Sequence, residues 1–157
     1  MESNRLNPGI PGLRQVLDGG FLQARSYMVR GEPGVGKTLL GLHFLSAGIE
    51  SGEDALYVNL GESEDDLREN AENFGFPLAD VRFLDLTPSA EFFSEDQSYD
   101  IFPSEEVEEN SLTSRVVRTV EEQSPERIFV DPLTQLRYLT KDDYQFRKQV
   151  LSFLQFL

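Results

Sequence analysis

The amino-acid sequence predicts a three-layer α/β domain, in which helices cover both faces of a mostly parallel β-sheet. Apolar segments of strand length alternate along the chain with longer segments whose apolar residues recur at helical spacing. A glycine-rich loop also stands between a short apolar segment and an apolar helix, as in the strand–loop–helix units of parallel sheets. Hydrophobic residues make up 39% of the 157 positions, which is sufficient for one domain with its own core.

The first third of the chain is expected to lead into the glycine-rich loop. Residues 7–25 are punctuated by glycine and proline, but apolar residues are interleaved, so we expect an ordered segment rather than a linker. Residues 26–30, Ser-Tyr-Met-Val-Arg, are expected to form a short strand. The glycine-rich residues 31–38 follow, and the leucines and phenylalanine after Thr38 predict a buried helix.

The middle of the chain predicts a strand, a helix and a second strand. Residues 54–60 are apolar and rich in strand formers. A helix is expected from Ser63 to about Phe74, because Ser63 and Asp66 have the spacing of a capping box. Residues 81–86 then predict the next strand.

The last part of the chain predicts a further helix–strand–helix unit after a long acidic loop at residues 87–103. A helix is expected over residues 104–123, a strand over 127–131 and a last helix from Asp142. The helical pattern still runs at Leu157 with no stop signal. We therefore expect residues 1–157 to be the N-terminal part of a single domain whose sheet is C-terminally incomplete.

The glycine-rich loop has the spacing GxxxxGK[ST], which is the phosphate-binding P-loop or Walker A motif. Its glycines allow successive backbone N–H groups to turn inward and surround phosphate oxygens. The lysine then reaches the β- and γ-phosphates and the threonine hydroxyl binds Mg²⁺. The predicted nucleotide-binding residues are Gly31, Glu32, Pro33, Gly34, Val35, Gly36, Lys37 and Thr38.

A nucleotide-bound Mg²⁺ also requires a carboxylate at the end of a neighbouring strand, and Asp131 closes the apolar strand 127–131. We therefore predict Thr38 and Asp131 as the metal-binding pair. Hydrolysis further requires a group that orients or deprotonates water. Glu62, just after the strand 54–60, is the candidate base, with Lys37 as the other catalytic residue. The alternative is that Glu62 belongs only to the acidic start of a helix, where carboxylates are favourable.

Composition narrows the class of protein. Acidic residues number 28 against 14 basic residues, so the net charge is −14, which argues against a nucleic-acid surface. Strong acidity with few lysines suits a salt-rich cytosol, and we expect a halophilic source. The absence of cysteine excludes disulfides and thiolate chemistry. No apolar run approaches the roughly 20 residues of a membrane span, so a cytoplasmic protein with no membrane contact is expected.

These motifs together resemble the RecA-superfamily ATPases, in particular KaiC-like ATPases of an archaeal, haloarchaeal type. Besides the Walker A loop, the resemblance rests on Gly-Ile-Pro-Gly-Leu at 9–13 followed by Gly19-Gly20, on residues 56–63 and on residues 128–134. It extends over essentially the whole chain and implies a RecA-like fold with ATP and Mg²⁺ as ligands. It also implies ATP hydrolysis and assembly into a homo-oligomeric ring, often a hexamer, and it leaves any signalling partner unknown.

One departure from the family bears on catalysis. The family carries two consecutive glutamates where this chain has Gly61-Glu62, and the first is usually considered the water-activating carboxylate. Three functions therefore remain open: an ATPase, a nucleotide-binding regulatory module with little turnover, and a recombinase-like DNA-dependent ATPase. Gly61 favours the second, and the acidic composition counts against the third.

Overall fold

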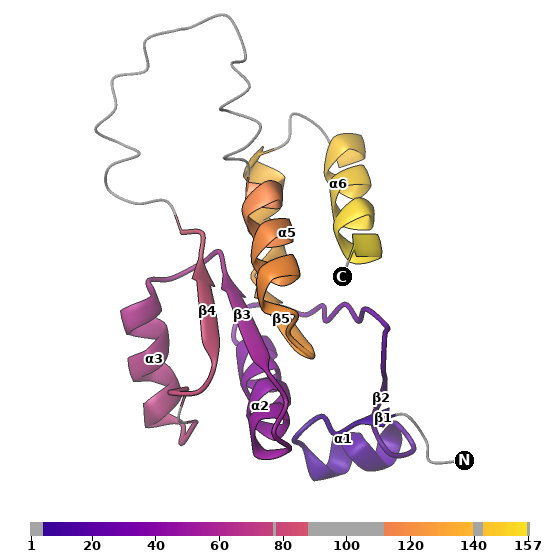
Figure 1. Ribbon diagram of the computed structural model, residues 1–157, viewed down its shortest axis with the longest axis vertical. Coiled ribbons are helices and arrows are strands. Elements are labelled where there is room, and N and C mark those ends of the chain that lie inside the picture. The colour runs from indigo at the N-terminus through magenta and orange to yellow at the C-terminus, as the bar shows by residue number, and fades with distance from the viewer. Residues whose placement is uncertain (1–4, 77, 88–111, 140–142, 157) are drawn as a thin grey trace, which may run out of the picture.

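The computed structural model describes residues 5–76, 78–87, 112–139 and 143–156, and it confirms the predicted α/β class. A three-stranded parallel sheet in the order β4-β3-β5 is flanked by helices (Figure 1). A separate two-stranded antiparallel sheet, β1-β2, precedes it. The elements are β1 (Arg5–Leu6), α1 (Pro11–Val16), β2 (Phe21–Leu22), α2 (Lys37–Glu50), β3 (Ala55–Asn59), α3 (Glu64–Asn73), β4 (Arg82–Asp85), α5 (Leu112–Gln123), β5 (Arg127–Asp131), the 3₁₀ helix η2 (Leu133–Leu139) and α6 (Asp143–Phe156).

The central strand β3 sets the register of the sheet. Its last residue, Asn59, lies opposite Asp85 of β4 on one side and opposite Asp131 of β5 on the other. Because parallel strands point the same way, their polar carboxyl ends share one edge of the sheet. Ligands of open α/β sheets bind at this kind of edge.

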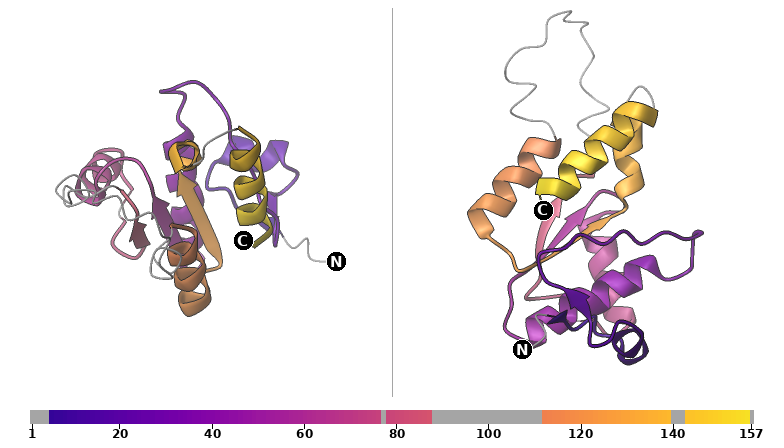
Figure 2. Two further views of the ribbon diagram at one scale, coloured as in Figure 1. Left: turned by 90° about the horizontal axis from the view of Figure 1, so that it is seen from above. Right: turned by 90° about the vertical axis from the view of Figure 1, so that its right-hand side faces the viewer.

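Both faces of the sheet are covered, because β3 is buried at every position and its side chains alternate between the two sides. Ala55 and Tyr57 pack in one core cluster with buried residues of α2 and α3. Leu56 and Val58 pack in the other cluster, which contains Val116 of α5 and Phe153 of α6. Figure 2 shows α5 and α6 on the opposite side of the sheet from α2.

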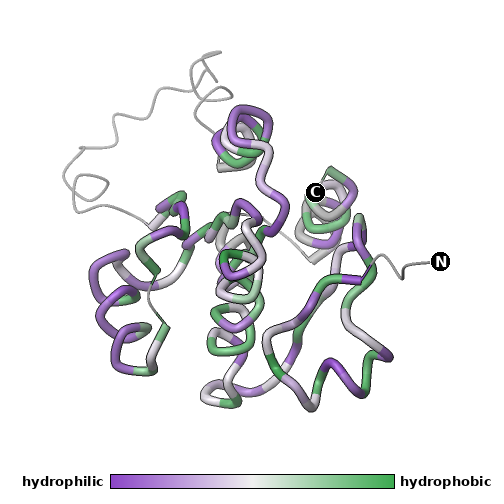
Figure 3. The backbone as a smooth tube through the Cα atoms, turned by 60° about the horizontal axis from the view of Figure 1, so that its bottom comes forward, coloured by the Kyte–Doolittle hydropathy of each residue, from purple (hydrophilic) through white to green (hydrophobic). Residues whose placement is uncertain are grey.

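Helix α3 is a surface helix that begins where the capping pattern predicted. The Ser63 hydroxyl accepts a hydrogen bond from the Asp66 backbone N–H at 3.2 Å, which satisfies one of the free donors of the first turn. Only Leu67 and Ala71 of this helix are buried, and Figure 3 shows the rest of it predominantly hydrophilic. This pattern keeps α3 at the outside of the domain, beside β4.

The N-terminal segment is ordered, as predicted, and it packs directly on α2. A Cβ atom at Gly9, whose φ is +77°, would collide with the backbone carbonyl of His43. Arg127, at 1% exposure, donates to the backbone oxygens of Asn7 and Phe44, each at 2.7 Å, and pairs with the Glu53 carboxylate. A single buried guanidinium therefore joins the N-terminal segment, α2 and β5.

The prediction of a strand at residues 26–30 was wrong. This segment has no regular secondary structure, and Tyr27, Met28 and Val29 are 46%, 54% and 42% exposed. The physical reason is that a strand requires a neighbour for its N–H and C=O groups, and no strand among the described residues pairs with this segment. Instead, the Tyr27 ring packs on Phe21 and its hydroxyl accepts from the Leu22 N–H at 2.9 Å.

The remaining predicted elements agree with the described structure, with shifts at their ends. Helix α5 begins at Leu112, and the predicted residues 104–111 and the acidic loop lie outside the described residues, apart from Thr87 at its start. The 3₁₀ helix η2 was not predicted.

Candidate functional site

The glycine-rich loop adopts the conformations that its glycines were predicted to allow. Gly34 and Gly36 have φ angles of +81° and +89°, a region that side chains disfavour, and Gly36 is the N-cap of α2. A Cβ atom at Gly31 would lie 2.7 Å from Cγ2 of Val35, so the exposed Val35 side chain would have to shift. The loop thus ends at the N-terminus of a 14-residue helix, where backbone N–H groups and the helix dipole favour an anion.

Lys37 folds back across this loop. Its Nζ donates to the backbone oxygens of Gly31 at 3.0 Å and Glu32 at 2.8 Å. The ammonium is therefore held by uncharged carbonyls, which position its charge without neutralising it. A phosphate in the loop would meet an oriented cation.

Helix α2 lies unusually close to β5 because two of its residues have no side chain. A Cβ atom at Gly41 would lie under 3.0 Å from three ring carbons of Phe129. A Cβ atom at Gly48, two helical turns further on, would meet the side chain of Arg127. This packing places the first turn of α2 beside the carboxyl end of β5.

Thr38 and Asp131 meet at this point. The Thr38 hydroxyl donates to Oδ2 of Asp131 at 2.6 Å, although the two residues are separated by 93 positions in the sequence. The hydroxyl of Tyr57, on β3, donates to the same Oδ2 at 3.1 Å. The two predicted metal-binding residues are thus in direct contact, and both hydroxyls engage the same oxygen of the carboxylate.

Tyr57 is held firmly between its neighbours. It is 1% exposed, its ring stacks on Phe83 at 5.2 Å and meets the ring of Phe129 edge-on at 5.3 Å. Burial raises the pKa of its hydroxyl far above the usual value, and the negative charges of Asp131 and Glu62 raise it further. The hydroxyl therefore remains protonated and acts as the donor to Asp131.

Asn59 organises the turn that carries Glu62. Its buried side-chain amide donates from Nδ2 to the backbone oxygen of Glu62 at 2.6 Å and accepts at Oδ1 from the Gly61 N–H at 3.2 Å. The exposed Glu62 side chain accepts through Oε2 from Asn70 of α3 at 3.1 Å. Glu62 thus lies at the same edge of the sheet as Asp131, tethered towards α3.

Gly61 is in close contact with the residue after Asp131. A Cβ atom at Gly61 would lie 2.9 Å from Cδ of Pro132, which is closer than real Cβ contacts. A side chain at position 61 would require Pro132 to move. Glycine at position 61 therefore goes together with close packing against the residue that follows β5.

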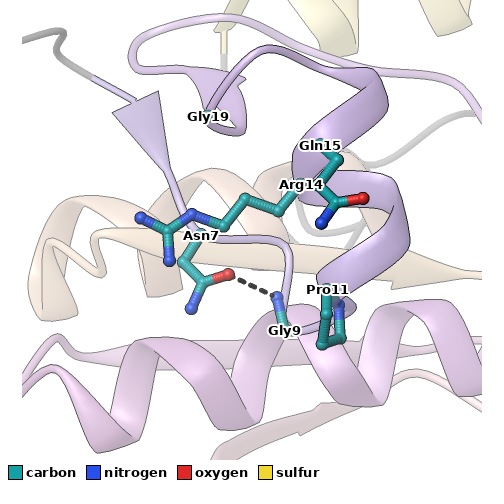
Figure 4. A pocket seen from close by; sticks show the side chains of 6 residues that line it. All are labelled: Asn7, Gly9, Pro11, Arg14, Gln15 and Gly19. Carbon is teal, nitrogen blue, oxygen red and sulfur yellow. Dashed lines mark hydrogen bonds between the residues drawn. The ribbon is translucent and has the colours of Figure 1, made fainter.

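A pocket in the N-terminal segment is separate from this site. It is lined by Asn7, Gly9, Pro11, Arg14, Gln15 and Gly19, with a volume of about 460 Å³ (Figure 4). The amide of Asn7 in its wall is already engaged, since Oδ1 accepts from the Gly9 N–H at 3.1 Å. None of its lining residues belongs to the glycine-rich loop.

Sequence reasoning missed Tyr57 and Asn59 as parts of the site. The sequence did contain a signal. Tyr57 and Asn59 are two positions apart on β3, so their side chains lie on the same face of the sheet, and Asn59 is at the carboxyl end of the strand. Their partner strand and its register were not readable from that segment alone. The contact of Tyr57 with Asp131 depends on that register.

Comparison with known proteins shows which family the sequence matches. A family model described as "ATPase: KaiC" matches residues 6–157. A UPF0273 protein of Methanopyrus kandleri is 29% identical over 148 residues, covering 90% of this chain and 58% of the relative. A UPF0273 protein of Thermotoga maritima is 30% identical over 148 residues, covering 87% and 58%. The circadian clock oscillator protein KaiC of Prochlorococcus marinus is 28% identical over 141 residues, covering 85% and 27%.

The chain spans 58% of the length of these two UPF0273 relatives. Within the described part of the chain, no helix combines the length and apolar character needed to cross a membrane. The phosphate-binding loop, its helix and the strand-end aspartate lie within the matched range, so the chain belongs to the family of KaiC-like P-loop ATPases of the RecA superfamily.

Proposed function

We propose that this chain binds ATP with Mg²⁺ in the loop formed by residues 31–38. The observation that carries the proposal is the 2.6 Å hydrogen bond between Thr38 and Asp131. It joins the end of the phosphate-binding loop to the carboxyl end of a parallel strand, which is the pair of positions that P-loop NTPases use for Mg²⁺. Membership of the KaiC-like family supports the same ligand.

The residues fit this ligand by their chemistry. Backbone N–H groups at the start of α2 and the Lys37 ammonium would bind phosphate oxygens. Thr38 and Asp131 offer a hydroxyl and a carboxylate oxygen to the cation. Magnesium is commonly bound by one or two carboxylates together with substrate phosphates, and it neutralises phosphate charge when bound.

The proposal is tested by equilibrium binding of a fluorescent ATP analogue to this chain in molar KCl with Mg²⁺. Saturable binding is expected in the wild type and is expected to disappear in Lys37→Ala. Lys148→Ala is the matched control, because Lys148 is an exposed lysine on α6. A folded wild-type chain that binds no analogue, or binding that survives in Lys37→Ala, would contradict the proposal.

We further propose that hydrolysis is slow and that nucleotide binding serves regulation. Gly61 supplies no carboxylate, and Glu62 is exposed and bonded to Asn70. Loss of one positioned general base typically costs about 10²–10⁴ in rate, whereas the phosphate-binding loop does not depend on it.

Gly61→Glu tests whether the missing carboxylate limits turnover. Phosphate release should rise with little change in analogue affinity. Gly61→Ala is the control for the forced movement of Pro132, because alanine adds the Cβ atom without the carboxylate. An equal effect of the two variants would show that packing, rather than a missing base, sets the rate.

We also propose a homo-oligomeric ring and a salt-rich environment for this chain. The ring is supported by the resemblance to KaiC-like ATPases, and the environment by the net charge of −14. Sedimentation velocity with and without ATP tests the ring, since a sedimentation coefficient that stays monomeric with bound ATP would contradict it.

A further inference from the structure

Asp131 is restrained by two hydroxyl groups that come from two different elements. Thr38 at the start of α2 and Tyr57 in the middle of β3 both donate to Oδ2, at 2.6 and 3.1 Å. Tyr57 lies opposite Phe129 in the sheet, so its long side chain reaches diagonally to the residue two positions further along β5. Neither hydroxyl binds the other carboxylate oxygen, Oδ1.

The two donors differ in what else they are expected to do. The Thr38 hydroxyl belongs to the phosphate-binding loop, where its oxygen is the expected cation ligand. Tyr57, by contrast, is a residue of the sheet that is only 1% exposed, and its hydroxyl donates to Asp131. Its aromatic ring is fixed by Phe83 on one strand and Phe129 on the other. The donor to Asp131 is therefore placed by the sheet itself.

Packing alone does not require this hydroxyl. A phenylalanine would fill the same space between the two neighbouring rings, whereas a buried hydroxyl costs free energy unless it is hydrogen-bonded. The one feature that tyrosine adds at this position is a fixed hydrogen bond to a carboxylate.

We propose that Tyr57 is a positioning residue for Asp131, which holds this carboxylate in the orientation that receives the nucleotide-bound Mg²⁺. The proposal rests on the proposed function, because it assigns a role at the same site. Hydrogen-bond partners behind a metal-binding carboxylate orient it, and their removal typically weakens metal affinity about 10–100-fold. Tyr57 should therefore affect the cation requirement more than nucleotide binding itself.

The test is a Mg²⁺ titration of ATP-analogue binding to this chain, with Tyr57→Phe compared with the wild type. Tyr57→Phe removes one hydroxyl and leaves the ring contacts in place. Tyr144→Phe is the matched control, since Tyr144 is 77% exposed on α6. The same titration is repeated in Asp131→Asn and in the double variant, and analogue affinity without Mg²⁺ and the midpoint of thermal unfolding are measured for each.

The expected result is that Tyr57→Phe raises the Mg²⁺ concentration for half-maximal binding by about 10-fold or more, with unchanged metal-free affinity. Tyr144→Phe should match the wild type, and Tyr57→Phe should have no further effect in the Asp131→Asn background. An unchanged Mg²⁺ requirement in Tyr57→Phe, or an equal effect with and without Asp131, overturns this inference while leaving the proposed function intact. A folded wild-type chain without nucleotide binding overturns both.

Discussion

The close approach of α2 to β5 can be tested with a single methyl group. Gly41→Ala would place a Cβ atom under 3.0 Å from three ring carbons of Phe129. Carbon atoms in contact prefer about 3.5–4.0 Å, so the ring or the helix would have to move by more than about 1 Å. The ring has little freedom, because it also meets the ring of Tyr57 edge-on, with 5.3 Å between the ring centroids.

Two opposing effects set the magnitude of this change. Overpacking of a core typically costs about 1–3 kcal/mol. Replacing glycine by alanine inside a helix returns up to about 1 kcal/mol. The large overlap with Phe129 places the overpacking cost at about 2–3 kcal/mol. Gly41→Ala should therefore lower the free energy of unfolding by about 1–2 kcal/mol, a shift of roughly 2–8 °C in the unfolding midpoint for a chain of this size. It should also weaken analogue binding, because the displaced helix carries Thr38 away from Asp131.

Thermal and urea unfolding provide the measurement, and two further variants isolate the contact. Gly12→Ala in α1 is the control, because its added Cβ atom meets no other atom within 4 Å. Phe129→Val removes the ring, so in that background Gly41→Ala should become stabilising. A Gly41→Ala chain as stable as Gly12→Ala would refute the reasoning. So would a destabilisation that persists when the ring is absent.

Three further predictions concern other parts of the structure. Arg127→Met should lower the free energy of unfolding in urea by about 3 kcal/mol, because Glu53 loses its buried partner. Arg147→Met is the control at an exposed arginine and should be neutral. Equal losses of stability in the two variants would contradict the prediction. Asn59→Ala should lower the free energy of unfolding by about 1–3 kcal/mol, since the turn after β3 loses the two hydrogen bonds that it makes with the Asn59 side chain. Hydrogen exchange of the Gly61 backbone N–H should then be faster, and an unchanged exchange rate would count against its hydrogen bond to Asn59. Molar KCl should raise the thermal midpoint by screening the net charge of −14, whereas a fall would oppose a salt-rich environment.

The sequence alone determined the fold class, the positions of the main helices and strands, and the phosphate-binding loop. These features depend on local patterns: the continuous apolar run that forms the buried strand β3, the Ser63 cap of α3, and the glycines that permit the loop's backbone conformations. Each can be predicted from a short segment, because the physical requirement lies within that segment. The strand ending at Asp131 was predicted for the same reason.

Tertiary structure decided which distant residues touch. Tyr57 and Asp131 are 74 positions apart, and their hydrogen bond exists because β3 and β5 pair in one particular register. The same holds for Arg127, which reaches back 120 positions to Asn7. The wrongly predicted strand at residues 26–30 has the same origin, since strand propensity is local but a strand's hydrogen bonds come from a neighbour. Local sequence patterns therefore identified the loop and the aspartate, but only the packing of α2 and β3 against β5 brings them into contact.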